Sequence, residues 1–394
     1  MRLPATFAVP LLALALAAQA PFPAGYRDAT FPNTTGQGTA SLAARVYYPA
    51  TAAGANQPVR PQAGGYPVLV FLHGFAALGR LYGPLGTAFA EHGCVAVLLD
   101  TAQFSGPTLT LDGIAMHGAL AVANQQAGHF LQGALDLQRM GVAGHSMGGG
   151  STIGVLARNP GYRCGLGFAP VDPGAAIQGV RVPLGVIHGQ GDTIVPPASG
   201  GLPWFQNAAA FADLSFLYLL NQDANHTNVC GFLLATQADQ EVFARCMRVA
   251  LGFFDRAVRG IPQGLEEVVG GAATSEPRLQ QLSVRYERPQ LWNQGAGRIG
   301  TTPVLRLGQE PGAAFVLVAA GTASLATPFG ILELDPASLL VLGQSTVGSA
   351  RLVSLPLPIP NDPGLLGAVL PLQGLGEGRG GLRLGNLLRI AFVN

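Results

Sequence analysis

Short apolar runs alternate with helical stretches between residues 40 and 260, and this alternation restricts the fold more than any other feature. Most of the runs are apolar throughout rather than at every second position, which is typical of strands buried on both faces. Such strands separated by helices predict a mostly parallel central sheet flanked by helices, an α/β architecture. The runs expected to form strands are SLAARVYYPA, YPVLVFLHG, CVAVLLDT, MGVAGHS, CGLGFAPVDP, PLGVIHGQGD and DLSFLYLL.

Helices are expected over residues 79–93, 112–126 and 147–159, between these runs. An amphipathic helix over 240–260 closes the series. Its apolar stripe should cover one face of the sheet, since the apolar residues recur at helical spacing. The stripe consists of Val242, Cys246, Val249, Phe253 and Ala257.

The chain of 394 residues is long enough for two domains. We assign 21–262 to the α/β domain and 263–300, which has few periodic apolar residues, to a linker. Residues 301–394 contain short apolar pieces separated by Gly and Pro, which predicts a small all-β, sandwich-like domain. With 48% apolar and 11% charged residues, the chain can bury a large core.

The first twenty residues have the pattern of a secretory signal peptide. Arg2 precedes the apolar run FAVPLLALALAA, and small residues follow at a cleavage site. We therefore expect residues 1–20 to be removed and the mature protein to be secreted, extracellular or periplasmic. A membrane-anchoring N-terminus is the alternative.

Charge and cysteine spacing exclude several classes of partner. The net charge of +1 argues against a nucleic-acid partner. The four cysteines form no C-x-x-C pair, so the sequence supports neither a zinc nor a redox motif. We expect a monomer that uses no cofactor and no metal.

The stretch AGHSMGGGS, residues 143–151, lies between an expected strand and an expected helix. Ser146 is flanked by Gly144 and Gly148 in the pattern G-x-S-x-G. A serine at a sharp strand-to-helix turn of this kind is a nucleophile elbow. The sequence thus predicts that Ser146 is a catalytic nucleophile.

A serine nucleophile needs a base, and the base needs an orienting carboxylate. In sheets of this kind these residues follow strand ends in the order Ser, Asp, His. Asp192 in QGDTIVPP and His226 in NQDANHTN occupy the expected loops. Asp172 and Asp223 compete with Asp192 for the role of the acid.

The other histidines fit the catalytic position less well. His188 lies within or at the end of a strand and should be structural, and His73 should support its loop. His117 and His129 flank a helix. His145, next to the candidate nucleophile, should line the cleft without acting as the base.

Acyl transfer also requires two backbone N–H groups that bind the developing oxyanion. One should come from Met147, which follows the nucleophile. The other should come from Phe75 in FLHGF, where Gly74 permits a tight turn.

Together, the motifs HGF, GHSMGGG, GDTIVP and NHTN resemble those of the bacterial cutinases and polyester (PET) hydrolases, which have the α/β-hydrolase fold. The resemblance covers roughly residues 40–260. It implies that Phe75 and Met147 form the oxyanion hole and that they line the acyl cleft together with Ile194. Val171 stands where these enzymes often carry a tryptophan, which argues against strong activity on aromatic polyesters.

The resemblance extends to two further regions. These enzymes usually have a C-terminal disulfide, for which Cys230 and Cys246 could pair, while Cys94 and Cys164 would be free thiols. The segments IPNDPGLLGAVLPLQGLG and LRLGNLLRIAFVN are similar to a terminal β-module on secreted proteins of planctomycete-like bacteria.

The leading hypothesis is a secreted serine esterase that forms an acyl-enzyme. No obvious lid insertion interrupts the strands, so we expect an open cleft that admits ester or polyester chains. A small-ester carboxylesterase or acetylhydrolase is the alternative enzyme. A catalytically silent protein that binds a polymer or cell surface through its C-terminal domain is the alternative from another class.

Overall fold

The computed structural model describes residues 21–159, 161–207 and 214–394. The signal peptide predicted over residues 1–20 lies outside the described residues. Within those ranges, no helix has both the length and the apolar character needed to cross a membrane.

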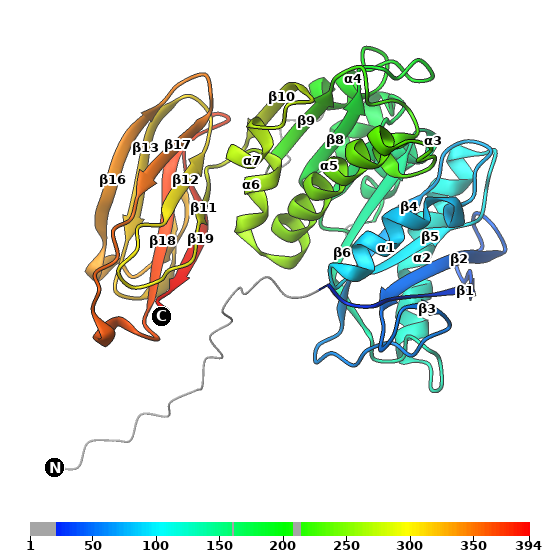
Figure 1. The fold of residues 1–394 in the computed structure, drawn as a ribbon, viewed down its shortest axis with the longest axis horizontal. Helices are drawn as coiled ribbons and strands as arrows, with labels where there is room; N and C mark the ends of the chain where they lie inside the picture. The colour runs from blue at the N-terminus through cyan, green and yellow to red at the C-terminus, as the bar shows by residue number, and fades with distance from the viewer. Residues whose placement is uncertain (1–20, 160, 208–213) are drawn as a thin grey trace.

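A ten-stranded sheet forms the centre of the larger unit (Figure 1). The strand order is β10-β9-β8-β7-β6-β4-β5-β2-β1-β3. The strands from β5 to β9 in this order are parallel, whereas β2 and β10 pair antiparallel with β5 and β9. The mostly parallel sheet is therefore confirmed. The strands are β1 (Ala24–Pro32), β2 (Ser41–Pro49), β3 (Gly54–Ala55), β4 (Tyr66–Leu72), β5 (Val95–Leu99), β6 (Leu135–His145), β7 (Gly165–Phe168), β8 (Leu184–Gly189), β9 (Leu214–Leu220) and β10 (Leu279–Tyr286).

Successive residues of a strand point to opposite faces of the sheet, and helices cover both of these faces. On β4, Leu69 and Phe71 join one core with helices α1 (Gly83–Glu91) and α5 (Gln237–Phe254). Val68 and Val70 join the other core with α2 (Gly106–Gln125), α3 (Met147–Leu156) and α4 (Gly201–Asn207). Four of the five residues of the predicted stripe, Val242, Cys246, Val249 and Phe253, are buried on α5, whereas Ala257 lies just beyond this helix and is partly buried.

The C-terminal unit is all-β, as predicted, and consists of antiparallel sheets around a separate apolar core. One sheet contains β11 (Gln290–Gln294), β12 (Val304–Gly308) and β17 (Leu352–Pro356). The second contains β16 (Leu340–Val347), β13 (Gly312–Val318), β18 (Val369–Gly378) and β19 (Gly381–Ala391). A hairpin of β14 (Thr322–Thr327) and β15 (Gly330–Leu334) packs on β18 and β19.

The segment 263–300 differs from the linker that its composition predicts. It forms short helices α6 (Leu265–Val268) and α7 (Gly271–Thr274), which Figure 1 shows beside the C-terminal unit. It then adds β10 to the edge of the large sheet and β11 to the C-terminal unit. Trp292 of β11 is fully buried in the core that α5 covers, and its indole N–H donates to Glu266 Oε2 at 2.9 Å. The two units are therefore joined by packing as well as by the chain.

Candidate active site

Ser146 lies on a strained turn between β6 and α3. Its φ of 54° and ψ of −117° are unusual for a residue with a side chain. The flanking glycines make the turn possible: a Cβ on Gly144 would collide with the backbone of Gly148, and one on Gly148 with the carbonyl of Leu72. The geometry is that of the elbow expected from the sequence.

Asp192 follows β8, at the edge of the sheet where the parallel strands end, and is buried. Oδ1 accepts the backbone N–H groups of Ile194 (2.9 Å) and Val195 (2.8 Å). Burial alone would raise the pKa of Asp192, but hydrogen bonds from His188, His226 and the Val195 amide outweigh it and hold the pKa well below its usual range. Asp192 is therefore a carboxylate at any pH at which the protein would work.

His226 lies in the loop after β9, with Nδ1 2.8 Å from Asp192 Oδ2. Asn225 and Asn228 shape this loop: Asn225 Oδ1 accepts the N–H groups of Thr227 and Asn228, and Asn228 Oδ1 accepts the N–H of Asn225. Because Nδ1 faces the carboxylate, Nε2 is the ring nitrogen left for another partner. Both asparagines belong to the motif NHTN, and residues of this type commonly shape turns, so the sequence carries a signal for this role.

The two alternative acids lie elsewhere. Asp172 Oδ1 accepts the N–H of Gly174 in an exposed turn. Asp223 has an exposed side chain 3.9 Å from Arg278. Of the three carboxylates considered, the structure brings only Asp192 to His226.

His145 corrects one expectation. Rather than lining the cleft, its side chain is 3% exposed and both ring nitrogens are engaged. Nδ1 lies 2.8 Å from the Tyr82 hydroxyl, and Nε2 lies 2.8 Å from the backbone oxygen of His226. Burial, followed by the neighbouring His226, lowers the pKa of His145 to about 3. Tyr82 was missed because no sequence motif marks it.

The two candidate oxyanion donors come from neighbouring segments. Met147 is the first residue of α3, where N–H groups have no partner within the helix. Phe75 follows Gly74, whose N–H donates to the Tyr82 hydroxyl at 3.0 Å. His73 is buried with its ring nitrogens facing the carbonyl oxygens of Gly74 and Thr101, so it supports this loop as expected.

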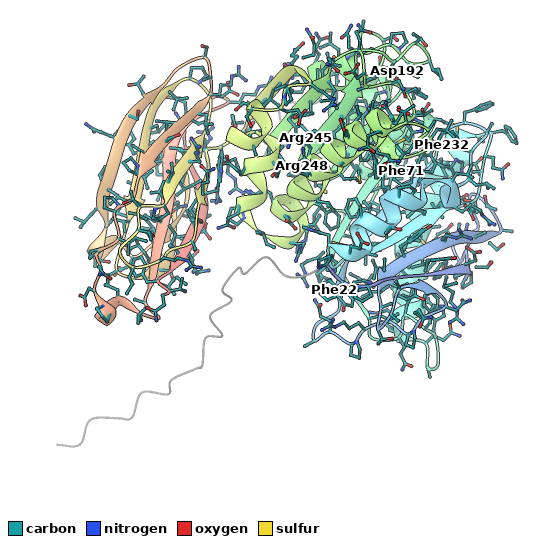
Figure 2. All side chains as sticks on the ribbon, in the orientation of Figure 1. Phe22, Phe71, Asp192, Phe232, Arg245 and Arg248 are labelled. Carbon is teal, nitrogen blue, oxygen red and sulfur yellow. The ribbon has the colours of Figure 1, made fainter. Side chains whose placement is uncertain are left out.

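Several apolar side chains belong to the loops that carry the candidate site residues. Phe75 is 63% exposed and Ile194 is 68% exposed, whereas Met147 and Val171 are partly buried. Phe104, which the sequence reasoning missed, is 68% exposed, and its ring lies 5.5 Å from that of Phe75 in an edge-on arrangement. Figure 2 shows Asp192 on the α/β unit, well apart from the C-terminal unit.

The cysteines give a second correction. All four lie in the described part of the chain, and all four are buried free thiols. Cys230 and Cys246 therefore do not form the disulfide that the family resemblance suggests. Among residues 21–159, 161–207 and 214–394, no group of three or more His, Cys, Asp or Glu is placed to hold a metal ion.

The sheet and the turn at Ser146 together define an α/β-hydrolase. Comparison with known families is more specific. The chain belongs to the PET hydrolase-like family (PETase), whose family model matches residues 10–238, more than half of its length.

Curated relatives are similar over part of their length. A bis(hydroxyethyl) terephthalate hydrolase of Streptomyces coelicolor is 30% identical over 167 residues, which are 42% of this chain and 52% of that protein. Cutinase est1 of Thermobifida alba is 28% identical over 142 residues, 35% of this chain and 46% of the relative. Cutinase cut1 of Thermobifida fusca is 28% identical over 140 residues, 34% and 42% respectively. The chain thus spans about half the length of these relatives, or less.

Proposed function

We propose that this protein is a secreted serine ester hydrolase of the cutinase and polyester-hydrolase type. The observation that carries the proposal is the 2.8 Å hydrogen bond between His226 Nδ1 and Asp192 Oδ2, at the strand ends that also hold Ser146. Ser146 Oγ attacks the ester carbonyl while His226 accepts its proton, and Asp192 stabilises the imidazolium. His226 then protonates the leaving alcohol, and water cleaves the acyl-enzyme with His226 as the base.

The backbone N–H groups of Phe75 and Met147 would stabilise the oxyanion of each tetrahedral intermediate. The exposed side chains of Phe75, Phe104 and Ile194 give the site an apolar rim, which suits an ester whose chain extends beyond the reacting group. The names of the relatives, cutinase and terephthalate ester hydrolase, support this substrate class. The predicted signal peptide supports secretion.

The test is hydrolysis of p-nitrophenyl acetate and p-nitrophenyl butyrate by the full chain and by Ser146→Ala. We expect the substitution to reduce kcat on the order of 10⁴-fold or more, since the remaining oxyanion donors give only residual catalysis. The melting temperature should not fall, because the hydroxyl is not needed for the turn. An active Ser146→Ala protein, or a wild-type protein inactive on both esters and on an aliphatic polyester film, would contradict the proposal.

A further inference from the structure

His188, at the end of β8, contacts the same carboxylate oxygen as His226. Its Nε2 lies 3.1 Å from Asp192 Oδ2 and 2.8 Å from the backbone oxygen of Val195. The backbone oxygen of Val195 can only accept, and so can Oδ2, because the pKa of Asp192 is low. The ring hydrogen is therefore on Nε2, shared between the two oxygens.

The other ring nitrogen of His188 has no hydrogen-bond partner within the described residues. Nδ1 is buried without a hydrogen-bond partner, and the side chain is 0% exposed. Gly201 packs so closely against it that a Cβ there would collide with Nδ1. Because a proton on Nδ1 would be buried without an acceptor, the surroundings fix the Nε2–H tautomer.

With His188, the Asp192 carboxylate has four donors. The amides of Ile194 and Val195 donate to Oδ1, and the two imidazoles share Oδ2. This number matches the lone-pair sites of an ionised carboxylate. A carboxylate that accepts four hydrogen bonds cannot rotate without losing at least one of them. The negative charge on Oδ2 interacts with two imidazole rings rather than with one.

We propose that His188 is a positioning residue for the catalytic acid: it fixes the orientation of Asp192 and weakens the pull of Oδ2 on the N–H of His226. This rests on the proposed function. Without His188, Oδ2 would interact more strongly with His226 and stabilise its imidazolium form. The neutral base would then form only at higher pH, so the acidic limb of the pH–rate profile would move upward.

In the described part of the chain, three other titratable groups lie next to the pair or to its loops: His145 faces the backbone oxygen of His226, Tyr82 faces the other side of the His145 ring, and Cys230 follows in the His226 loop. Burial raises the pKa of Tyr82 and of Cys230 above the range of the measurement, and it lowers that of His145 to about 3. None of the three changes charge between pH 5 and 9, so they cannot move the limb.

The experiment measures kcat/KM for p-nitrophenyl butyrate from pH 5 to 9 in the full chain, His188→Leu and His188→Gln. In His188→Leu we expect a loss of about 10- to 100-fold, by analogy with the loss seen when a residue that orients a metal-binding side chain is removed. Its acidic limb should move up by about half a pH unit or more, because the lost donor leaves more negative charge beside His226. His188→Gln keeps a donor of similar reach and should stay close to wild type in both respects.

His117→Leu is the control, because this ring packs on Tyr162 outside the site. The acidic limb of the pH–rate profile of this variant should coincide with that of the wild type. If His188→Leu does not fold, His188→Asn replaces it, since the shorter amide does not reach Oδ2. A loss of activity with an unmoved limb would overturn the proposal and leave His188 a purely structural residue.

A second measurement separates this proposal from the proposed function. The proton between His226 Nδ1 and Asp192 Oδ2 should give a low-field NMR resonance in Ser146→Ala, which needs no catalytic activity. Adding His188→Leu to that variant should shift the resonance further downfield, because Oδ2 becomes the stronger acceptor. An unchanged resonance would count against the role of His188, whereas a protein inactive on every ester would count against the esterase itself.

Discussion

The Tyr82 hydroxyl donates a hydrogen bond of 2.8 Å to Nδ1 of His145. The same hydroxyl accepts the N–H of Gly74, and the other side of the His145 ring binds the backbone oxygen of His226. This buried chain of hydrogen bonds joins the loop of one candidate oxyanion donor to the loop of the candidate base, through the residue that precedes the candidate nucleophile.

Tyr82→Phe should therefore disturb both loops at once. It leaves the Gly74 N–H and His145 Nδ1 without a partner, which costs about 1–3 kcal/mol of stability for each buried group. We expect kcat/KM for p-nitrophenyl butyrate to fall by about tenfold, because a 1 kcal/mol change in transition-state stabilisation already changes the rate several-fold. Tyr162→Phe is the control: it removes a buried hydroxyl that donates to Gly113 O at 2.8 Å, away from the site. Equal losses of activity in the two variants would contradict the link.

Asp192→Asn tests the assignment of the acid. An amide cannot stabilise the imidazolium and favours the wrong tautomer of His226, so we expect a loss of about 10³- to 10⁴-fold in kcat. Asp172→Asn and Asp223→Asn remove exposed carboxylates and should leave kcat nearly unchanged. The assignment would be wrong if either of them showed the larger loss.

His145 makes the stability of the protein depend on pH. Its pKa is about 3 in the folded protein and 6.5 in the reference state. Between these values the unfolded chain binds a proton that the folded one does not. The free energy of unfolding should therefore fall as the pH falls below 6.5, by at most about 1.4 kcal/mol per pH unit from this ring.

Denaturant unfolding at pH 7, 6, 5 and 4 measures this dependence. In His145→Gln the slope should be shallower, because the titrating group is gone, whatever the absolute stability of the variant. Parallel curves for the two proteins would show that His145 is not the group responsible.

Phe104 should matter for long substrates and not for short ones. Its ring is exposed beside Phe75 and can pack against a chain that extends from the reacting ester. We expect Phe104→Ala to reduce product release from an aliphatic polyester film by about 3- to 10-fold, equivalent to about 1 kcal/mol of lost contact. The rate on p-nitrophenyl acetate should stay the same. Phe329→Ala removes an exposed ring of the C-terminal hairpin as a control, and the same loss there would argue against a specific role for Phe104.

Truncation tests how the two units depend on each other. Composition favours a cut near residue 265, but such a cut removes β10 from the edge of the sheet and Trp292 from the core. A chain that ends at residue 264 should therefore be poorly soluble. One that ends at residue 288 keeps β10, and it should melt at a lower temperature than the full chain but retain p-nitrophenyl butyrate hydrolysis.

The measurement compares the two truncated proteins in soluble yield, melting temperature and p-nitrophenyl butyrate hydrolysis. Equal solubility and stability would mean that β10 contributes nothing to the sheet. Retained soluble-ester activity with lost activity on a polyester film would instead assign a surface-binding role to the C-terminal unit.

The order of elements and the positions of Ser146, Asp192 and His226 could be predicted from the sequence, because each depends on a local pattern. Continuous apolar runs report burial on both faces, and the parallel strands bring their following loops to one edge of the sheet. Gly144 and Gly148 reveal the turn at Ser146, since only residues without a side chain fit there.

The contacts between distant segments were decided by the tertiary structure alone. Nothing local to Tyr82, His145 or His188 shows that their rings meet the Gly74, His226 and Asp192 groups, because those contacts form only when separate strand ends pack together. Likewise, 263–300 has few periodic apolar residues and resembles a linker, yet β10 pairs with β9 at the edge of the large sheet and Trp292 is buried in the core that α5 covers. Local patterns thus determined which residues occupy the strand ends, whereas long-range packing decided which side chains hold them in place.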